Sequence, residues 1–237
     1  MCRVLWPEFL DAENHFLRSM GHMKAYAGLK FSVTKVISVR NQLLREQFGR
    51  SMSYFYAQGY PAGIKSVYHG THPRNLASIV KNNLKLDPSQ SIDSGYFGRG
   101  MYFSQYPDYT MMYRTSGELR CVRAGDNIKL LRFDILPGRT QTLVSVNLGA
   151  DRTLYKDSHI SPTGFEHVMF DSRHFNPTHI IHVSVRNAPG HSFDGTPEQI
   201  GPAGAGGDAA AGVAAVGAGG VAAAAVVAAG ADGAEDT

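Results

Sequence analysis

The sequence predicts an α+β fold, because segments with helical spacing lie mostly in its first half and strand-like segments mostly in its second half. Two neighbouring segments show the two patterns. β-Branched residues alternate with others at 31–39, as in a strand, and apolar residues recur at helical spacing at 42–56. From residue 189 onward Gly, Pro and Ala dominate, so no hydrophobic core can form there. We therefore expect one folded α+β region followed by a tail.

Gly and Pro residues divide the rest of the folded region into short elements. Two helices are expected to begin at Pro73 and Pro107, because proline suits the first position of a helix. The first of them should end near residues 82–83. Strands are expected at 64–68, 101–104, 128–135, 140–146, 166–170 and 179–185.

Composition divides the chain into a weakly patterned lead-in at 1–30, a folded domain at 31–186 and a tail at 187–237. Residues 1–186 carry all 23 Lys and Arg and 14 of the 20 acidic residues, a formal net charge of +9. The tail is rich in Ala and Gly, carries six acidic residues and no basic one, and is expected to be disordered. The positive domain favours an anionic partner such as a dinucleotide, an acidic protein or a nucleic acid, without choosing among them.

Several classes of protein are disfavoured by the composition. Cys2 and Cys121 are too few for a disulfide framework or a zinc site. The first residues lack the apolar run of a secretory signal, so we expect an intracellular protein, cytoplasmic or nuclear. Residues 209–231 carry no charge, but they are nearly all Ala and Gly and gain little from a membrane interior. We therefore expect no membrane association.

The first candidate motif is YHGT at 68–71. Here a buried strand ends in a His that is followed by Gly, which places a polar ring beside backbone with no side chain. A glycine at this point would let a flat ligand approach the main-chain N–H and C=O groups closely. The structural alternative is a hydrogen-bonded His before a turn.

The second candidate motif is GYFGRGMYFSQYPDYTMMY at 95–113. Its glycines are typical of a nucleotide-binding loop, although they match neither GxGxxG nor a P-loop. Tyrosines can stack on a planar ring while their hydroxyls contact ribose oxygens. We interpret Tyr96, Tyr106 and Tyr109 as core or rim aromatics, which leaves Tyr102 and Tyr113 as the candidates for ligand contact.

The third candidate motif is GFEHVMFD at 164–171, in which Glu166 stands at the start of a predicted strand among apolar residues. A carboxylate in that position either lies at the open end of the sheet, or is buried there, which is costly unless it has a partner. A solvated strand end is the structural alternative.

Together the three motifs resemble the catalytic domain of the poly(ADP-ribose) polymerase family over about residues 31–186. The signature of that family is a His, a Tyr and a Glu on three strands, and His69, Tyr102 and Glu166 match it. The resemblance implies split antiparallel β-sheets with flanking helices, the ADP-ribosyltransferase fold. It also implies that residues 31–186 are a catalytic domain.

The resemblance further implies a binding site for NAD+, which serves as a substrate, and no metal. The backbone of Gly70, with Thr71 beside it, would hold the nicotinamide carboxamide. Thr110 would complete this clamp, Tyr113 would stack on the nicotinamide ring, and Asn75 would lie in the helix that borders the site.

Three further residues would carry the reaction, by the same resemblance. His69 would hydrogen-bond the adenosine ribose, and Tyr102 would pack beside the nicotinamide ribose. Glu166 would accept a hydrogen bond from a hydroxyl of that ribose and stabilise the oxocarbenium-like centre left when nicotinamide departs. Residues 88–97 would form the loop that closes over the donor.

The expected activity is transfer of ADP-ribose to an acceptor, either another protein or the chain itself. Mono- and poly-ADP-ribosylation both remain open, because the segment at 136–166 matches the family weakly. An NAD glycohydrolase and a non-catalytic NAD or ADP-ribose binding module are the alternatives. A third alternative is an RNA-modifying transferase, which the net charge of +9 suggests; a nucleic-acid acceptor is thus possible but not indicated, because no single element carries a stripe of Lys and Arg.

Overall fold

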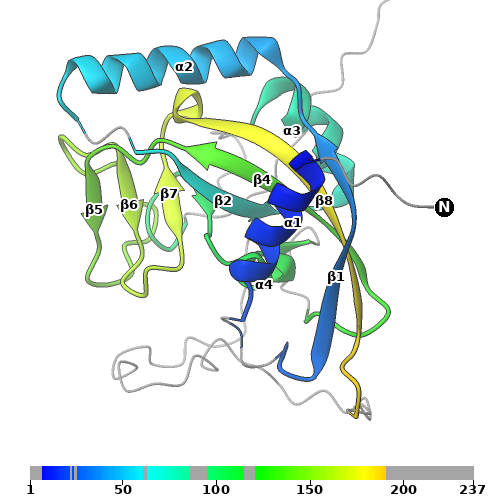
Figure 1. Ribbon diagram of the computed structural model, residues 1–237. Coiled ribbons are helices and arrows are strands. Elements are labelled where there is room, and N and C mark those ends of the chain that lie inside the picture. Colours follow the sequence, from blue (N-terminus) through cyan, green and yellow to red (C-terminus); the bar gives the residue numbers. More distant parts are fainter. Residues whose placement is uncertain are drawn as a thin grey trace, which may run out of the picture.

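The computed structural model describes residues 7–21, 23, 26–60, 63–85, 95–114 and 121–190 (Figure 1). The α-helices are α1 (Pro7–Arg18), α2 (Gln42–Ala57), α3 (Leu76–Asn82) and α4 (Pro107–Thr110). The strands are β1 (Leu29–Ser38), β2 (Lys65–Gly70), β3 (Met101–Phe103), β4 (Asn127–Ile135), β5 (Thr140–Thr142), β6 (Ser158–Ile160), β7 (His167–Met169) and β8 (Phe175–Asn187). Short 3-10 turns are η2 (Pro73–Asn75), η4 (Met111–Tyr113) and η5 (Ser172–His174). The predicted α+β class is confirmed.

The strands form two four-stranded sheets. The first has the order β1-β8-β4-β2 and is antiparallel throughout, whereas the second has the order β3-β7-β6-β5 and contains one parallel pair, β5 with β6. The sheets are therefore split as expected, although the second is mixed. They meet where Tyr68 of β2 pairs with Ser104, directly after β3, through two backbone hydrogen bonds.

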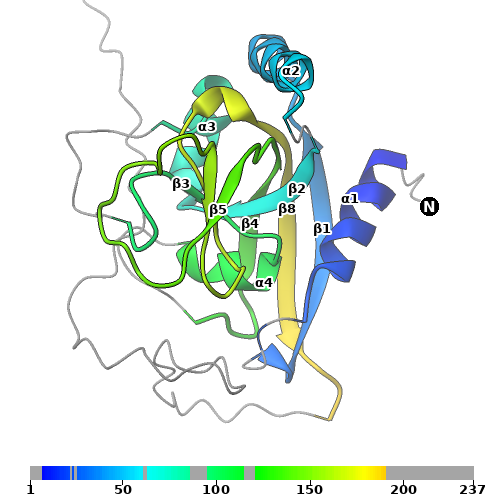
Figure 2. The ribbon, with the colours of Figure 1, turned by 90° about the vertical axis from the view of Figure 1, so that its left-hand side faces the viewer.

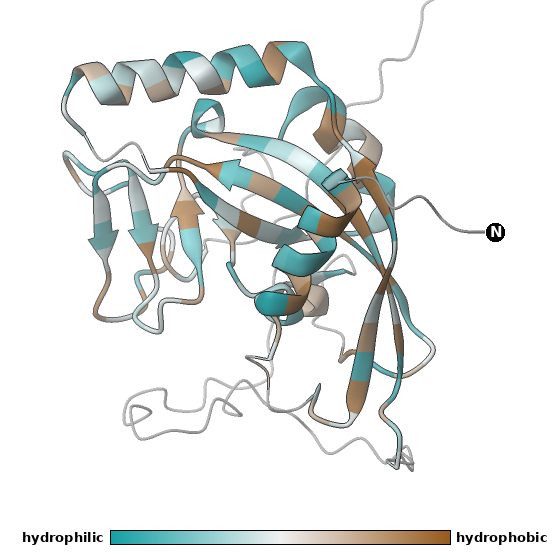
Figure 3. Cartoon of the chain, in the orientation of Figure 1, coloured by the Kyte–Doolittle hydropathy of each residue, from teal (hydrophilic) through white to brown (hydrophobic). Residues whose placement is uncertain are grey.

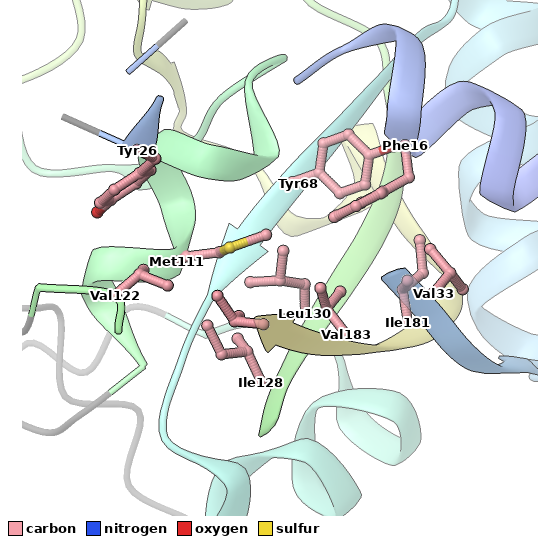
Figure 4. Packing of buried hydrophobic residues seen from close by; sticks show 11 residues of the cluster. Phe16, Tyr26, Val33, Tyr68, Met111, Val122, Ile128, Leu130, Ile181 and Val183 are labelled. Carbon is pink, nitrogen blue, oxygen red and sulfur yellow. The ribbon is translucent and has the colours of Figure 1, made fainter. Parts of the chain in front are cut away.

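The first sheet has an apolar core on each face, because side chains alternate along its strands (Figure 3). On one face the core lies beneath α1. Figure 4 shows Phe16 of α1 beside Tyr68, with Leu130 and Val183 of the sheet nearby. On the other face Ile79 of α3 packs in a second core. In Figure 2, α1 and α3 lie on opposite sides of the sheet.

The helix α1 lies inside the predicted lead-in, where our sequence analysis predicts no helix. Its buried residues are Ala12 and Phe16, one turn apart, and both side chains are fully enclosed. Asp11 of the same helix forms an ion pair with Arg132 of β4 at 3.0 Å. Phe9, Ala12 and Phe16 recur at helical spacing, and Phe9 packs against the same core, so the sequence carried a signal for this helix that our sequence analysis overlooked.

Most other predicted elements are present with shifted ends. Asn41 caps α2 as expected, its side chain accepting a hydrogen bond from the backbone N–H of Leu44. The strand predicted at 140–146 ends at Thr142, β8 is longer than predicted, and β6 was not predicted. Residues 88–94 of the predicted closing loop and the tail from residue 191 lie outside the described residues. No helix in the described ranges is long and apolar enough to cross a membrane.

Candidate functional site

The strands that carry the three signature residues lie next to one another. The short strand β3 lies between β2, which it meets at the Tyr68–Ser104 bridge, and β7, with which it pairs through Tyr102 and Val168. His69 belongs to β2, and Glu166 immediately precedes β7. The fold thus brings His69, Tyr102 and Glu166 together from three separate segments, in the order His, Tyr, Glu.

His69 has one ring nitrogen held by the protein and one without a partner. Nδ1 lies 2.9 Å from the backbone oxygen of Tyr102, and because a carbonyl oxygen only accepts, Nδ1 must donate. Burial lowers the pKa of His69, which favours the neutral ring. In that tautomer Nε2 is an acceptor, and among the described residues it has no hydrogen-bond partner although it is buried. His69 can therefore accept a hydrogen bond from a ligand hydroxyl.

The Tyr102 hydroxyl holds the glycine-rich turn that precedes β3. It accepts a hydrogen bond from the backbone N–H of Phe97 at 2.8 Å and donates one to the oxygen of Gly98 at 2.9 Å. Gly98 has φ +114°, and a side chain there would press against His159 and Phe170. Tyr102 thus joins this turn to His69, because its backbone carbonyl oxygen accepts the hydrogen bond from Nδ1 of His69.

His159 holds the same turn from the opposite side and was missed by the sequence analysis. Its Nε2 accepts from the backbone N–H of Thr153 at 3.0 Å, so Nδ1 donates to the oxygen of Phe97 at 2.9 Å. The side chain is fully buried in β6. No sequence signal marks it, because it is one of ten histidines and lies in a strand that was not predicted.

Glu166 presents one carboxylate oxygen to the protein and leaves the other unpaired. Its Oε1 accepts a hydrogen bond from the hydroxyl of Tyr109. Its Oε2 is buried and has no hydrogen-bond partner among the described residues. Like Nε2 of His69, this oxygen can accept a hydrogen bond from a ligand hydroxyl.

Tyr109 links Glu166 to Tyr113. Its hydroxyl oxygen lies 3.0 Å from that of Tyr113, and because Tyr109 gives its proton to Glu166, Tyr113 must donate in this contact. Burial is the main cause that raises the pKa of Tyr109, and the nearby Tyr113 and Glu166 raise it further, so the phenol stays protonated. We interpreted Tyr109 as a core or rim aromatic and did not expect its hydrogen bond to Glu166. Its position one helical turn before Tyr113 was the sequence signal that places the two side chains next to each other.

Gly70 lies against the backbone of α4. A Cβ atom at this position would be 1.9 Å from the carbonyl oxygen of Thr110 and 3.3 Å from the Cβ of Tyr113. The absence of a side chain is therefore required by the packing of the protein itself, whatever ligand approaches. The Thr110 hydroxyl is buried and donates to the oxygen of Pro107 at 2.9 Å, so only its lone pairs can serve a ligand.

Thr71 and Asn75 form a buried pair just after β2. The Asn75 side-chain amide donates to the hydroxyl of Thr71 at 3.1 Å. This contact fixes the turn η2, which leads the chain from the end of β2 into α3. Both residues therefore border the site and shape it. Within the described ranges no three His, Cys, Asp or Glu side chains lie together in a way that could hold a metal ion.

The arrangement is suited to a ligand rich in hydroxyl groups. Among the described residues, two buried acceptors have no hydrogen-bond donor: Nε2 of His69 on β2, and Oε2 of Glu166, which directly precedes β7. Leaving a buried acceptor unpaired costs about 1–3 kcal/mol, and a ligand hydroxyl at each atom would remove that cost. Ribose hydroxyls are donors of the required kind.

Comparison with known proteins identifies the family and supports the fold. The sequence matches the family described as poly(ADP-ribose) polymerase catalytic domain over residues 7–163, a match that ends just before Glu166. Among solved structures, the TASOR pseudo-PARP domain is similar with a TM-score of 0.64 and 14% sequence identity, covering 78% of this chain and 98% of that one. At this identity the similarity shows the fold alone. No curated protein matches the chain.

Proposed function

The chain belongs to the poly(ADP-ribose) polymerase catalytic domain family, and on that premise we propose that it is an NAD+ ADP-ribosyltransferase. In the proposed reaction the bond between nicotinamide and ribose breaks, and the ADP-ribosyl group passes to an acceptor, either another protein or the chain itself. One observation carries the proposal: within the described part of the chain, the buried Oε2 of Glu166 and Nε2 of His69 both have no hydrogen-bond donor.

Glu166 would stabilise the positive charge that develops during bond cleavage. When the C1′–N bond breaks, its electron pair leaves with nicotinamide, which becomes neutral, and the ribose becomes oxocarbenium-like. A fixed carboxylate beside this centre lowers the barrier, because its attraction grows as positive charge builds up on the ribose. Tyr109 supports this role by holding Oε1, so that Oε2 remains directed to the ribose hydroxyl.

His69 and the tyrosines would position the dinucleotide. The unpaired Nε2 of His69 would accept from a hydroxyl of the adenosine ribose, and the Tyr113 ring would stack on nicotinamide. Both side chains are themselves held, His69 by the Tyr102 carbonyl and Tyr113 by Tyr109. Restricted motion of the donor favours attack at C1′ by an acceptor nucleophile.

A non-catalytic binding module is the second candidate, and the resemblance to a domain described as a pseudo-PARP favours it. A module that only binds the dinucleotide does not need a buried carboxylate. Glu166 would then carry an unpaired oxygen without benefit to the protein. This cost favours the enzymatic function.

Incubation of the purified full chain with NAD+ labelled in its adenylate phosphate tests the proposal. We expect release of nicotinamide and label on the chain or on an added acceptor protein. Nicotinamide release with label only in free ADP-ribose would instead identify a glycohydrolase. Binding of NAD+ without nicotinamide release would establish the binding module. The Glu166→Gln variant is the control for a trace of contaminating enzyme.

A further inference from the structure

A row of basic residues crosses three strands of the first sheet. In the β1–β8 register Lys35 lies opposite His182, and in the β4–β8 register Lys129 lies opposite the same His182. Residues directly opposite one another in antiparallel strands project from the same face. Lys35, His182 and Lys129 therefore form a line, and the two lysines are among the causes that lower the pKa of His182.

Two more rows extend this line toward the end of β8. Ser184 lies opposite both Ser32 and Asn127, and Arg186 lies opposite Lys30. Successive rows are about 7 Å apart along a strand, and neighbouring strands about 4.8 Å apart. We call the surface formed by these three rows the basic face; its members are Lys30, Ser32, Lys35, Asn127, Lys129, His182, Ser184 and Arg186.

The basic face is not neutralised by the described part of the chain. No strand position on it is acidic, and none of its four Lys and Arg side chains is in an ion pair with a described residue. All four are exposed. The adjoining row contains Ile180 and Leu131, where the α3 core begins, so the basic face starts where the covered part of this side of the sheet ends.

The residues on the basic face fit phosphate groups. Lysine and arginine neutralise phosphates, and Ser and Asn side chains between them supply further donors to phosphate oxygens. The strand positions of this face hold no aromatic residue on which a base could stack, so binding would rest on the phosphates and would not depend on sequence. A flexible single strand can lie along the sheet surface with its phosphates beside the cations.

We propose that the basic face binds the sugar–phosphate backbone of single-stranded nucleic acid. The inference is independent of the proposed reaction, because binding is measured without NAD+. Sequence analysis found no stripe of Lys and Arg on one element, and the structure explains why: the cations come from β1, β4 and β8, which lie far apart in the chain.

Fluorescence anisotropy of a fluorescein-labelled oligouridylate, titrated with the full chain at several salt concentrations, tests the proposal. Four phosphate contacts predict that log K falls with log salt at a slope of about −3. Lys35→Glu combined with Lys129→Glu should weaken binding at least about tenfold and lower the magnitude of the slope by about half. Lys35→Gln combined with Lys129→Gln should give a smaller loss in the same direction.

The matched control is Arg45→Glu combined with Arg50→Glu. It changes the net charge by the same amount as the Lys35→Glu and Lys129→Glu pair, but on the exposed surface of α2. Its affinity should stay within about twofold of the parent, because charge effects beyond a Debye length are largely screened. Equal losses in both charge-reversed variants would overturn the proposal, since net charge alone would then explain binding. Absence of any binding by the full chain would overturn it as well.

The acidic tail is the competing occupant, because it follows β8 directly and carries six carboxylates. A full chain in which each of these becomes the corresponding amide separates the two cases. Oligouridylate binding by this variant alone would mean that the tail occupies the basic face in the full chain, which would overturn the proposal for the protein as it exists. The six positions are Asp194, Glu198, Asp208, Asp232, Glu235 and Asp236.

Discussion

Replacing Glu166 with Gln should reduce turnover far more than it reduces affinity for NAD+. The substitution preserves size, and the Gln carbonyl oxygen can still accept the hydrogen bond that Tyr109 gives to Oε1. The change therefore falls on Oε2, the buried oxygen for which no described residue is a hydrogen-bond partner. There an acceptor becomes an amide N–H donor, and the negative charge is lost.

The size of the effect follows from the lost charge. Two opposite unit charges about 4 Å apart attract by about 4 kcal/mol at an effective dielectric constant of about 20. Removal of one preorganised contact to a transition state typically costs about 3–4 kcal/mol. Turnover should therefore fall by about a hundredfold to a thousandfold, whereas the dissociation constant for NAD+ should change by less than about tenfold.

Two measurements check this prediction: nicotinamide release under saturating NAD+, and the dissociation constant of a non-hydrolysable NAD+ analogue by calorimetry. Thermal unfolding of both proteins controls for loss of structure. Turnover within a few-fold of the parent would refute the reasoning, and Glu166 would then be a strand-end residue with no part in catalysis. A loss in affinity with unchanged turnover under saturating NAD+ would mean that Glu166 binds the ground state as strongly as the transition state.

Three further predictions follow from the site and its surroundings. Tyr109→Phe removes the hydrogen bond to Glu166 and should slow nicotinamide release by about tenfold or more, with Tyr106→Phe as the control; equal rates would show that Glu166 needs no support. Gly70→Ala places a Cβ against the Thr110 carbonyl oxygen and should lower the free energy of unfolding in urea by about 2–3 kcal/mol. Gly63→Ala, which meets open space, should be close to neutral. Burial lowers the pKa of His167 from 6.5 to about 4, so the unfolded chain binds the proton more readily; the free energy of unfolding should fall as the pH drops from about 6.5 to about 4, and His167→Gln should weaken that dependence.

The sequence predicted the fold best where one periodicity runs through a whole element. Leu44, Phe48 and Phe55 fall on one side of α2, and the alternation along 31–39 matches β1 closely. Sequence analysis missed β6, which has only three residues, and it missed α1, although Phe9, Ala12 and Phe16 recur there at helical spacing.

The candidate site could be located from its motifs, but its internal contacts could not. The spacing of His69, Tyr102 and Glu166 along the chain points to three strands, and the register of β3 places those strands together. Hydrogen bonds made by Tyr109 and His159 depend on how α4 and β6 pack, which no local pattern encodes. The basic face was hidden for the same reason, because register between distant strands brings its cations together.

The two halves of the candidate site are carried by different sheets, His69 by the first and Glu166 by the second. The two sheets meet at the Tyr68–Ser104 bridge and also at three packed aromatic rings. The ring centroid of Phe103 lies 5.0 Å from that of Phe133 and 5.1 Å from that of Phe175. The relative position of His69 and Glu166 therefore depends on apolar packing between the two sheets. We expect substitutions that change the volume of these rings to shift the two residues relative to each other. In the proposed enzyme, the rate could then change through core substitutions while His69 and Glu166 stay the same.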